Sequence, residues 1–100
     1  MDKRLIITIP HYNNFDGLLK TIESISEQFE IDIVITDDGS PLKLNEKLII
    51  SSYKNKGKIF FKYLDKNYGV GIAANKCLQF VKKGSYKYMA RLDAGDICYE

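Results

Sequence analysis

Two acidic segments are the part of this sequence best suited to chemistry. Residues 37–40 (Asp-Asp-Gly-Ser) follow the apolar run 31–36, and residues 93–96 (Asp-Ala-Gly-Asp) follow the run 86–92. Each segment has a plain interpretation as a turn, in which Asp and Ser satisfy loop backbone groups and Gly adopts a positive φ. Neighbouring carboxylates repel each other, however, and a nucleoside donor group or a metal ion would offset that repulsion.

The two segments favour different ligands. One carboxylate of the pair at 37–38 can accept the ring N–H of a pyrimidine while its neighbour keeps a structural role. The carboxylates at 93 and 96 suit a hard cation such as Mg²⁺ or Mn²⁺, which commonly bridges a protein to a diphosphate. A diphosphate leaving group needs its charge neutralised as its bond to a sugar breaks.

The loop after the first apolar run carries an imidazole and a phenol ring. His11 is the only histidine of the chain, and a lone loop histidine is usually a packed or solvated residue rather than a base. Tyr12 could stack on a nucleobase or could equally be a partly buried aromatic at the rim of a sheet. We therefore expect more from Tyr12 than from His11.

Alternating apolar runs and helical patterns indicate how these residues are positioned. The predicted strands are residues 4–9, 31–36, 58–64 and 86–92, and the predicted helices are residues 15–29, 42–53 and 70–82. Strands that alternate with helices imply parallel pairing through right-handed crossovers. The expected fold class is therefore α/β, an open, mostly parallel sheet with helices on both faces and strand 4–9 in the interior.

Helical spacing also predicts which side chains face the core. The first helix, capped by Asn13 or Asn14 after a turn at Pro10, is expected to bury one apolar face. The expected inward side chains are Leu18, Leu19, Ile22, Ile25 and Phe29 in the first helix, and Leu44, Leu48, Ile49 and Tyr53 in the second.

The segments with candidate ligand-binding residues all follow predicted strands. In open α/β sheets, ligands bind beyond the carboxyl ends of the strands. The segments expected at that edge are residues 10–14, 37–40, 67–69 and 93–96. We therefore expect one site built from these four loops.

Composition bounds the class of protein. One hundred residues suit one domain, and 45% hydrophobic with 28% charged residues is ordinary for a soluble protein. A net charge of +2 gives no reason to expect a nucleic-acid partner. Cys77 and Cys98 form no Cys-x-x-Cys motif, so we expect no disulfide and a cytoplasmic location. The run 5–9 is too short for a signal peptide or a membrane span.

In order and spacing, five segments resemble those of family-2 glycosyltransferases. They are residues 6–14 (Ile-Ile-Thr-Ile-Pro-His-Tyr-Asn-Asn), the helix with Leu19, Ile22 and Gln28, residues 33–40 (Ile-Val-Ile-Thr-Asp-Asp-Gly-Ser), residues 67–75 with Asn67, Gly69, Ala73 and Asn75, and residues 91–96 (Arg-Leu-Asp-Ala-Gly-Asp). Each segment alone is a weak signal, whereas five in order span nearly the whole chain.

The resemblance implies a Rossmann-like GT-A fold and specific roles. It implies a nucleoside-diphosphate sugar donor, with a UDP-sugar the first choice, and usually Mg²⁺ or Mn²⁺. By position, the implied nucleotide-binding residues are Pro10, Tyr12 and Asp38 at the base, Asn67, Gly69 and Asn75 in the pocket wall, and Asp93 beside the ribose and diphosphate. Asp93 and Asp96 are the implied metal ligands, and Asp37 is expected to order the loop.

Three positions depart from the family pattern. Gly95 stands where the acidic tetrad usually has an aspartate, which reduces the protein ligands for a metal. Ala74 replaces a frequent arginine, and Cys77 replaces a frequent glycine. The first departure bears on metal affinity, and the other two bear on a phosphate contact and on packing.

The activity implied is transfer of a sugar, with inversion, to an acceptor hydroxyl of a carbohydrate or a lipid-linked molecule, in bacterial polysaccharide or glycolipid synthesis. Residues 1–100 are then the nucleotide-sugar-binding portion, with the acceptor-binding part and an Asp or Glu general base expected beyond residue 100. Two alternatives stay open: a sugar nucleotidyltransferase, which would usually show a Gly-rich basic loop in place of residues 10–14, and a non-catalytic α/β binding module.

Overall fold

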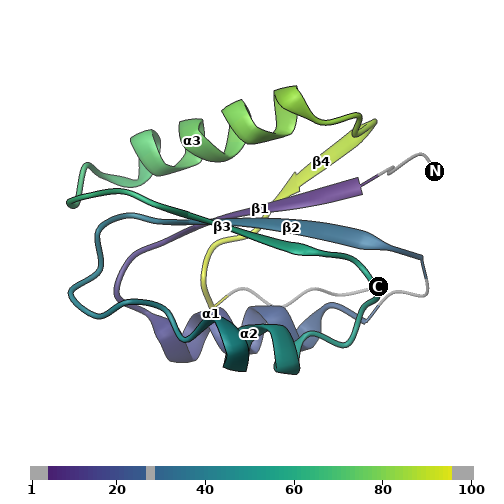
Figure 1. Cartoon of the computed structure of the whole chain (residues 1–100), viewed down its shortest axis with the longest axis horizontal. Helices are drawn as coiled ribbons and strands as arrows, with labels where there is room; N and C mark the ends of the chain where they lie inside the picture. The colour runs from purple at the N-terminus through teal and green to yellow at the C-terminus, as the bar shows by residue number, and fades with distance from the viewer. Residues whose placement is uncertain (1–4, 27–28, 96–100) are drawn as a thin grey trace.

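The computed structural model describes residues 5–26 and 29–95 as a sheet between two layers of helices (Figure 1). The elements in chain order are β1 (Leu5–His11), α1 (Phe15–Ser24), β2 (Ile31–Asp37), α2 (Glu46–Ser52), β3 (Ile59–Tyr63), α3 (Val70–Lys83) and β4 (Tyr88–Arg91). The strand order is β3-β2-β1-β4, and every neighbouring pair is parallel. Helix α3 covers one face and helices α1 and α2 cover the other. The predicted open parallel sheet, with the first strand in its interior, is confirmed.

The two interior strands are buried on both faces, as their continuous apolar runs predict. Alternate side chains point to opposite faces of a strand. Ile7, Ile9 and the odd-numbered residues 31–35 join the core beneath α1 and α2. Ile6 and Val34 join Cys77 in a smaller cluster beneath α3. Because β-branched residues suit a pleated, buried surface, these two strands form the rigid base on which the loops rest.

Strand β1 runs past the predicted turn at Pro10 and ends at His11. Pro10 pairs with Thr36 in the parallel register of β1 and β2. On the other side, β4 accompanies β1 only as far as Thr8, whose carbonyl accepts from the Leu92 N–H at 3.1 Å. The backbone groups of Thr8 and Pro10 face the same side of β1, the side toward β4. Because Pro10 lies beyond the end of β4, its missing N–H breaks no sheet hydrogen bond.

Helix α1 ends five residues earlier than predicted. Ile25 already has an extended backbone, and its N–H bonds to the Ile22 carbonyl in a tightened last turn. The Ser24 hydroxyl donates to the Thr21 carbonyl at 2.7 Å, an alternative to the helical bond that favours termination. Ile25 remains buried, whereas Phe29 is 56% exposed and does not belong to the helix face.

Helix α2 begins one turn later than predicted. Asn45 caps it by accepting the Leu48 N–H at 3.2 Å, and the helix then spans only Glu46–Ser52. Leu44 reaches the core from the preceding loop, and Ile49 is the buried residue of the helix itself. The predicted inward position of Leu48 is wrong, since 42% of it is exposed. Ile49 faces the core, and Leu48, one residue and about 100° away around the helix, does not.

Candidate functional site

All four strands point their carboxyl ends toward the same edge of the sheet, and the loops that follow them meet there (Figure 1). These loops contain the segments expected from the sequence. Asp37 and Asp38 are adjacent in the chain but point to opposite faces, because side-chain direction alternates along a strand. Their contacts are correspondingly different.

Asp37 is buried on the α1 side and binds the only histidine. Its Oδ1 lies 2.8 Å from His11 Nδ1. The other ring nitrogen, Nε2, accepts the backbone N–H of Asn14 at 3.0 Å. The ring proton is therefore assigned to Nδ1, and the neutral imidazole donates to the Asp37 carboxylate. His11 thus connects the end of β1 to the end of β2 and binds Asn14, the N-cap residue of helix α1.

Ser40 extends this network to the neighbouring loop. Asp37 accepts both the Ser40 N–H at 3.0 Å and the Ser40 hydroxyl at 2.6 Å. The Ser40 Oγ in turn accepts the Asn13 N–H at 2.8 Å. The loop after β1 and the loop after β2 are therefore held together through one buried carboxylate, consistent with the loop-ordering role expected of Asp37.

Asp38 is buried on the α3 side and binds the loop that leads into α3. Its Oδ1 accepts the Tyr68 N–H at 2.8 Å, and its Oδ2 accepts the Gly69 N–H at 2.9 Å. Gly39 follows with a φ of +70°, and a Cβ at this position would lie 2.2 Å from the Lys66 carbonyl carbon. Only glycine lets the two loops approach so closely.

A hollow of about 290 Å³ lies between these loops. Its lining residues are Pro10, His11, Tyr12, Asp38, Asn67, Gly69, Val70 and Ala73. Five residues predicted to bind the nucleotide are among them, namely Pro10, Tyr12, Asp38, Asn67 and Gly69. Tyr12 is 45% exposed and contributes a ring to the wall. An aromatic ring beside a buried carboxylate is an arrangement suited to a planar nucleobase.

Of the residues predicted to bind the nucleotide, Asn75 and Asp93 do not line this hollow. Asn75 lies on α3 two positions beyond Ala73, which is buried against the sheet. Two residues turn a helix by about 200°, so Asn75 is exposed on the far side. Val70 joins the lining instead, and no local sequence pattern distinguished it.

The acidic turn after β4 lies against helix α1. The Asp93 side chain is 61% exposed, and its Oδ1 accepts from Arg91 Nε at 3.2 Å. Asp96 lies outside the described residues. Within residues 5–26 and 29–95, no three His, Cys, Asp or Glu side chains gather in a way that could hold a metal ion. An exposed carboxylate is a suitable donor for a hard cation, and Asp93 is the one carboxylate among the described residues of this turn, 92–95.

Gly95 has a φ of +103°, in the region that disfavours L side chains. A Cβ there would meet only Asn14 Nδ2, at 3.8 Å, so space is not the restriction. An aspartate at this position, as in the usual acidic tetrad, would need a different backbone. The glycine at position 95 therefore suits the positive φ of this turn, which an aspartate would adopt only with strain.

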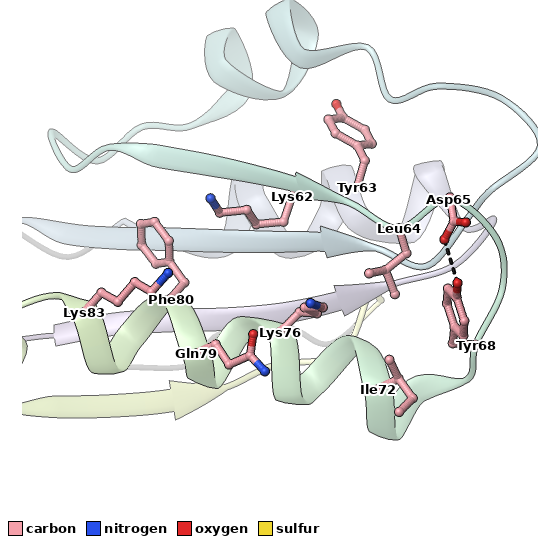
Figure 2. A pocket seen from close by; sticks show the side chains of 10 residues that line it. All are labelled: Lys62, Tyr63, Leu64, Asp65, Tyr68, Ile72, Lys76, Gln79, Phe80 and Lys83. Atoms are coloured by element: carbon pink, nitrogen blue, oxygen red, sulfur yellow. Dashed lines mark hydrogen bonds between the residues drawn. The ribbon is translucent and has the colours of Figure 1, made fainter.

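A larger hollow lies elsewhere, between β3 and the neighbouring face of α3 (Figure 2). It measures about 740 Å³ and is lined by Lys62, Lys76, Lys83, Phe80 and six other residues. The Lys62 ammonium lies 5.1 Å from the Phe80 ring centre, and Asp65 accepts the Tyr68 hydroxyl at 2.8 Å. That hydrogen bond raises the pKa of Tyr68. The hollow contains none of the predicted site residues, so we assign the site to the smaller one.

Cys77 has a structural role. It lies on the buried side of α3, where its Sγ is 3.1 Å from the Thr36 hydroxyl. Burial raises the pKa of this thiol, which disfavours the reactive thiolate. The cysteine at this position is thus a packing residue, as expected.

Comparison with known proteins decides the family. Residues 6–100 match glycosyl transferase family 2. The chain belongs to this family. The pocket and the acidic turn therefore lie in a family-2 glycosyltransferase chain, whose fold is GT-A.

Named relatives agree with the family. The chain is 30% identical over 91 residues to the bifunctional glycosyltransferase pgtA of Dictyostelium discoideum, covering 89% of this chain and 12% of that protein. It is 32% identical over 101 residues to the uncharacterized glycosyltransferase RC0461 of Rickettsia conorii, covering 99% of this chain and 16% of that protein. The chain thus spans a small part of the length of these relatives.

A solved structure shares the fold. Staphylococcus aureus TarS, residues 1–349, superposes with a TM-score of 0.73 at 24% identity, over 94% of this chain and 28% of that one.

In the described residues, no helix is both long enough and apolar enough to cross a membrane.

Proposed function

We propose that this chain binds the donor of a sugar transfer: a nucleoside-diphosphate sugar whose sugar passes, with inversion, to an acceptor hydroxyl. The observation that carries the proposal is the pocket formed by Tyr12, Asp38 and the loop 67–69 at the carboxyl edge of the sheet. The acceptor is a carbohydrate or a lipid-linked molecule, and the process is bacterial polysaccharide or glycolipid synthesis.

The pocket fits a pyrimidine through Asp38. The carboxylate accepts one backbone N–H on each oxygen, which holds it in place. Each oxygen keeps a second lone pair, so the carboxylate can also accept the N3–H of uracil. Tyr12 offers a ring on which the base can stack. UDP is therefore the first nucleotide to test.

The diphosphate belongs over the turn that follows β4. Asp93, with Asp96, would hold Mg²⁺ or Mn²⁺ there, and the ion would neutralise charge on the leaving diphosphate. Since Asp93 is the one carboxylate in the described residues of this turn, the nucleotide phosphates would help to complete the coordination shell. Metal binding is accordingly expected to be weak without nucleotide.

Transfer itself is a single in-line displacement at the anomeric carbon. An Asp or Glu general base, expected in sequence beyond residue 100, would take the proton of the acceptor hydroxyl. Residues 1–100 orient the donor. The pocket binds the nucleobase, and the acidic turn binds the diphosphate. Orientation of this kind lowers the barrier by holding the reacting groups in line.

A calorimetric titration of UDP with and without Mn²⁺ tests the proposal. We expect Mn²⁺ to raise UDP affinity by about tenfold, a gain of about 1.4 kcal/mol. Asp96→Ala should abolish this gain and leave metal-free affinity within about twofold, because it removes only a metal ligand. Glu23→Gln, which alters an exposed carboxylate on α1, should keep the full gain. Equal UDP affinity of the unmodified protein in Mn²⁺ and in chelator would rule out the metal role.

A further inference from the structure

The backbone of the turn at residues 93–95 is held by helix α1 and by its N-cap residue Asn14. The Gly95 N–H is shared between the Gly17 carbonyl at 3.0 Å and the Thr21 hydroxyl at 2.9 Å. The Ala94 carbonyl accepts from the Asn14 side-chain amide at 3.3 Å. These contacts join residues more than seventy positions apart, and they fix the backbone from which the Asp93 side chain projects.

Asn14 contacts both parts of the proposed site, the nucleobase pocket and the acidic turn. Its backbone N–H donates to His11, which lines the nucleobase pocket. Its side-chain Oδ1 accepts the Gly17 N–H at 3.2 Å and caps α1, which leaves the Nδ2 group to donate to Ala94. One residue therefore contacts the loop after β1 and the turn after β4.

Gly17 leaves room for this arrangement. A Cβ at Gly17 would lie 2.4 Å from Asn14 Nδ2, so a larger residue would displace the amide from its place beside Ala94. Thr21, one turn further along α1, is fully buried, and its hydroxyl also contacts the Gly17 carbonyl at 3.1 Å. The face of α1 toward the acidic turn is thus built from small or short polar residues.

We propose that Asn14 and Thr21 are positioning residues for the acidic turn. They hold residues 93–95 against α1 and thereby set the direction in which Asp93 presents its carboxylate to the diphosphate. Through the bond from Asn14 to His11, the same contacts fix the distance between the nucleobase pocket and the acidic turn. This inference rests on the proposed function for its ligand, and on the hydrogen bonds above for its geometry.

Thr21→Val tests the proposal, with Thr21→Ser as the matched control. Valine keeps the shape of threonine but cannot accept the Gly95 N–H, whereas serine keeps the hydroxyl. We expect hydrogen exchange of the Gly95 amide, measured without metal, to speed up about two- to tenfold in Thr21→Val, the worth of one neutral hydrogen bond. Thr21→Ser should restore the slow exchange. Equal exchange in the unmodified protein and Thr21→Val would overturn the holding role.

The second readout is the gain in UDP affinity on adding Mn²⁺. It should shrink about two- to tenfold in Thr21→Val and recover in Thr21→Ser, while metal-free UDP affinity stays unchanged. Asn14→Asp should act in the same direction, because aspartate still caps α1 but has no N–H for the Ala94 carbonyl. An undiminished gain in Thr21→Val overturns the positioning role alone. No gain in the unmodified protein overturns the metal role of the acidic turn, and Gly95 exchange then decides the holding role by itself.

Discussion

Replacing Asp37 by alanine should lower the free energy of unfolding by about 2 to 5 kcal/mol. The buried carboxylate accepts from His11 Nδ1 and twice from Ser40. Alanine would leave the buried imidazole N–H without a partner and remove two hydrogen bonds to a charged oxygen, each worth about 1.5 to 3 kcal/mol. Urea denaturation of the unmodified protein and the variant measures the difference.

Two further variants show whether the loss of stability in Asp37→Ala comes from the buried network. Asp37→Asn keeps an oxygen that can accept from His11 and should lose about half as much stability. Asp16→Ala, which removes an exposed aspartate from the first turn of α1, should cost no more than about 1 kcal/mol. If Asp37→Ala were as stable as Asp16→Ala, the buried network between the two loops would not exist in solution.

Asp38→Asn should weaken UDP binding by about 1 to 3 kcal/mol, which is about 5- to 150-fold. The amide lacks the negative charge of the carboxylate, and its NH₂ group would face the N–H of Tyr68 or Gly69. The loop 67–69 would then lose one of its two anchors, and uracil N3–H would meet a weaker acceptor. Calorimetric titration well below the melting temperature measures the change.

CDP provides the control for a base-specific effect. Cytosine carries a lone pair rather than a proton on N3 and can donate to the Asp38 carboxylate only through its N4 amino group, so Asp38→Asn should affect CDP binding less than UDP binding. Equal losses for the two nucleotides would mean that Asp38 does not recognise the N3–H of uracil. Unchanged UDP affinity would leave Asp38 as a turn residue.

The sheet could be predicted because its information is local. Residues 5–9 and 31–36 are continuous apolar or β-branched runs, apart from Asp32, and such runs are typical of strands covered on both faces. Asp32 is tolerated because its carboxylate accepts the Lys58 N–H and the Tyr86 hydroxyl. The site could be predicted in outline for the same reason, since ligands bind where parallel strands end.

The helix ends could not be predicted because tertiary contacts and single hydrogen bonds decide them. The apolar pattern of α1 continues to Phe29, yet the Ser24 and Ile25 contacts end the helix first. The contacts of Asn14 and Thr21 with the turn at 93–95 join residues too distant for any periodicity to reveal. A lone histidine has no sequence pattern that indicates its role, and only the fold shows His11 between Asp37 and Asn14.

The central claim is that UDP occupies the small pocket at the carboxyl edge of the sheet rather than the larger groove beside β3. Mapping of backbone amide chemical shifts during a UDP titration tests it most directly. The account predicts saturable changes concentrated at Tyr12, Asp38 and residues 67–70, with the amides of Lys76 and Phe80 unaffected. Changes concentrated along β3 and the groove face of α3, around Lys62 and Phe80, would contradict it.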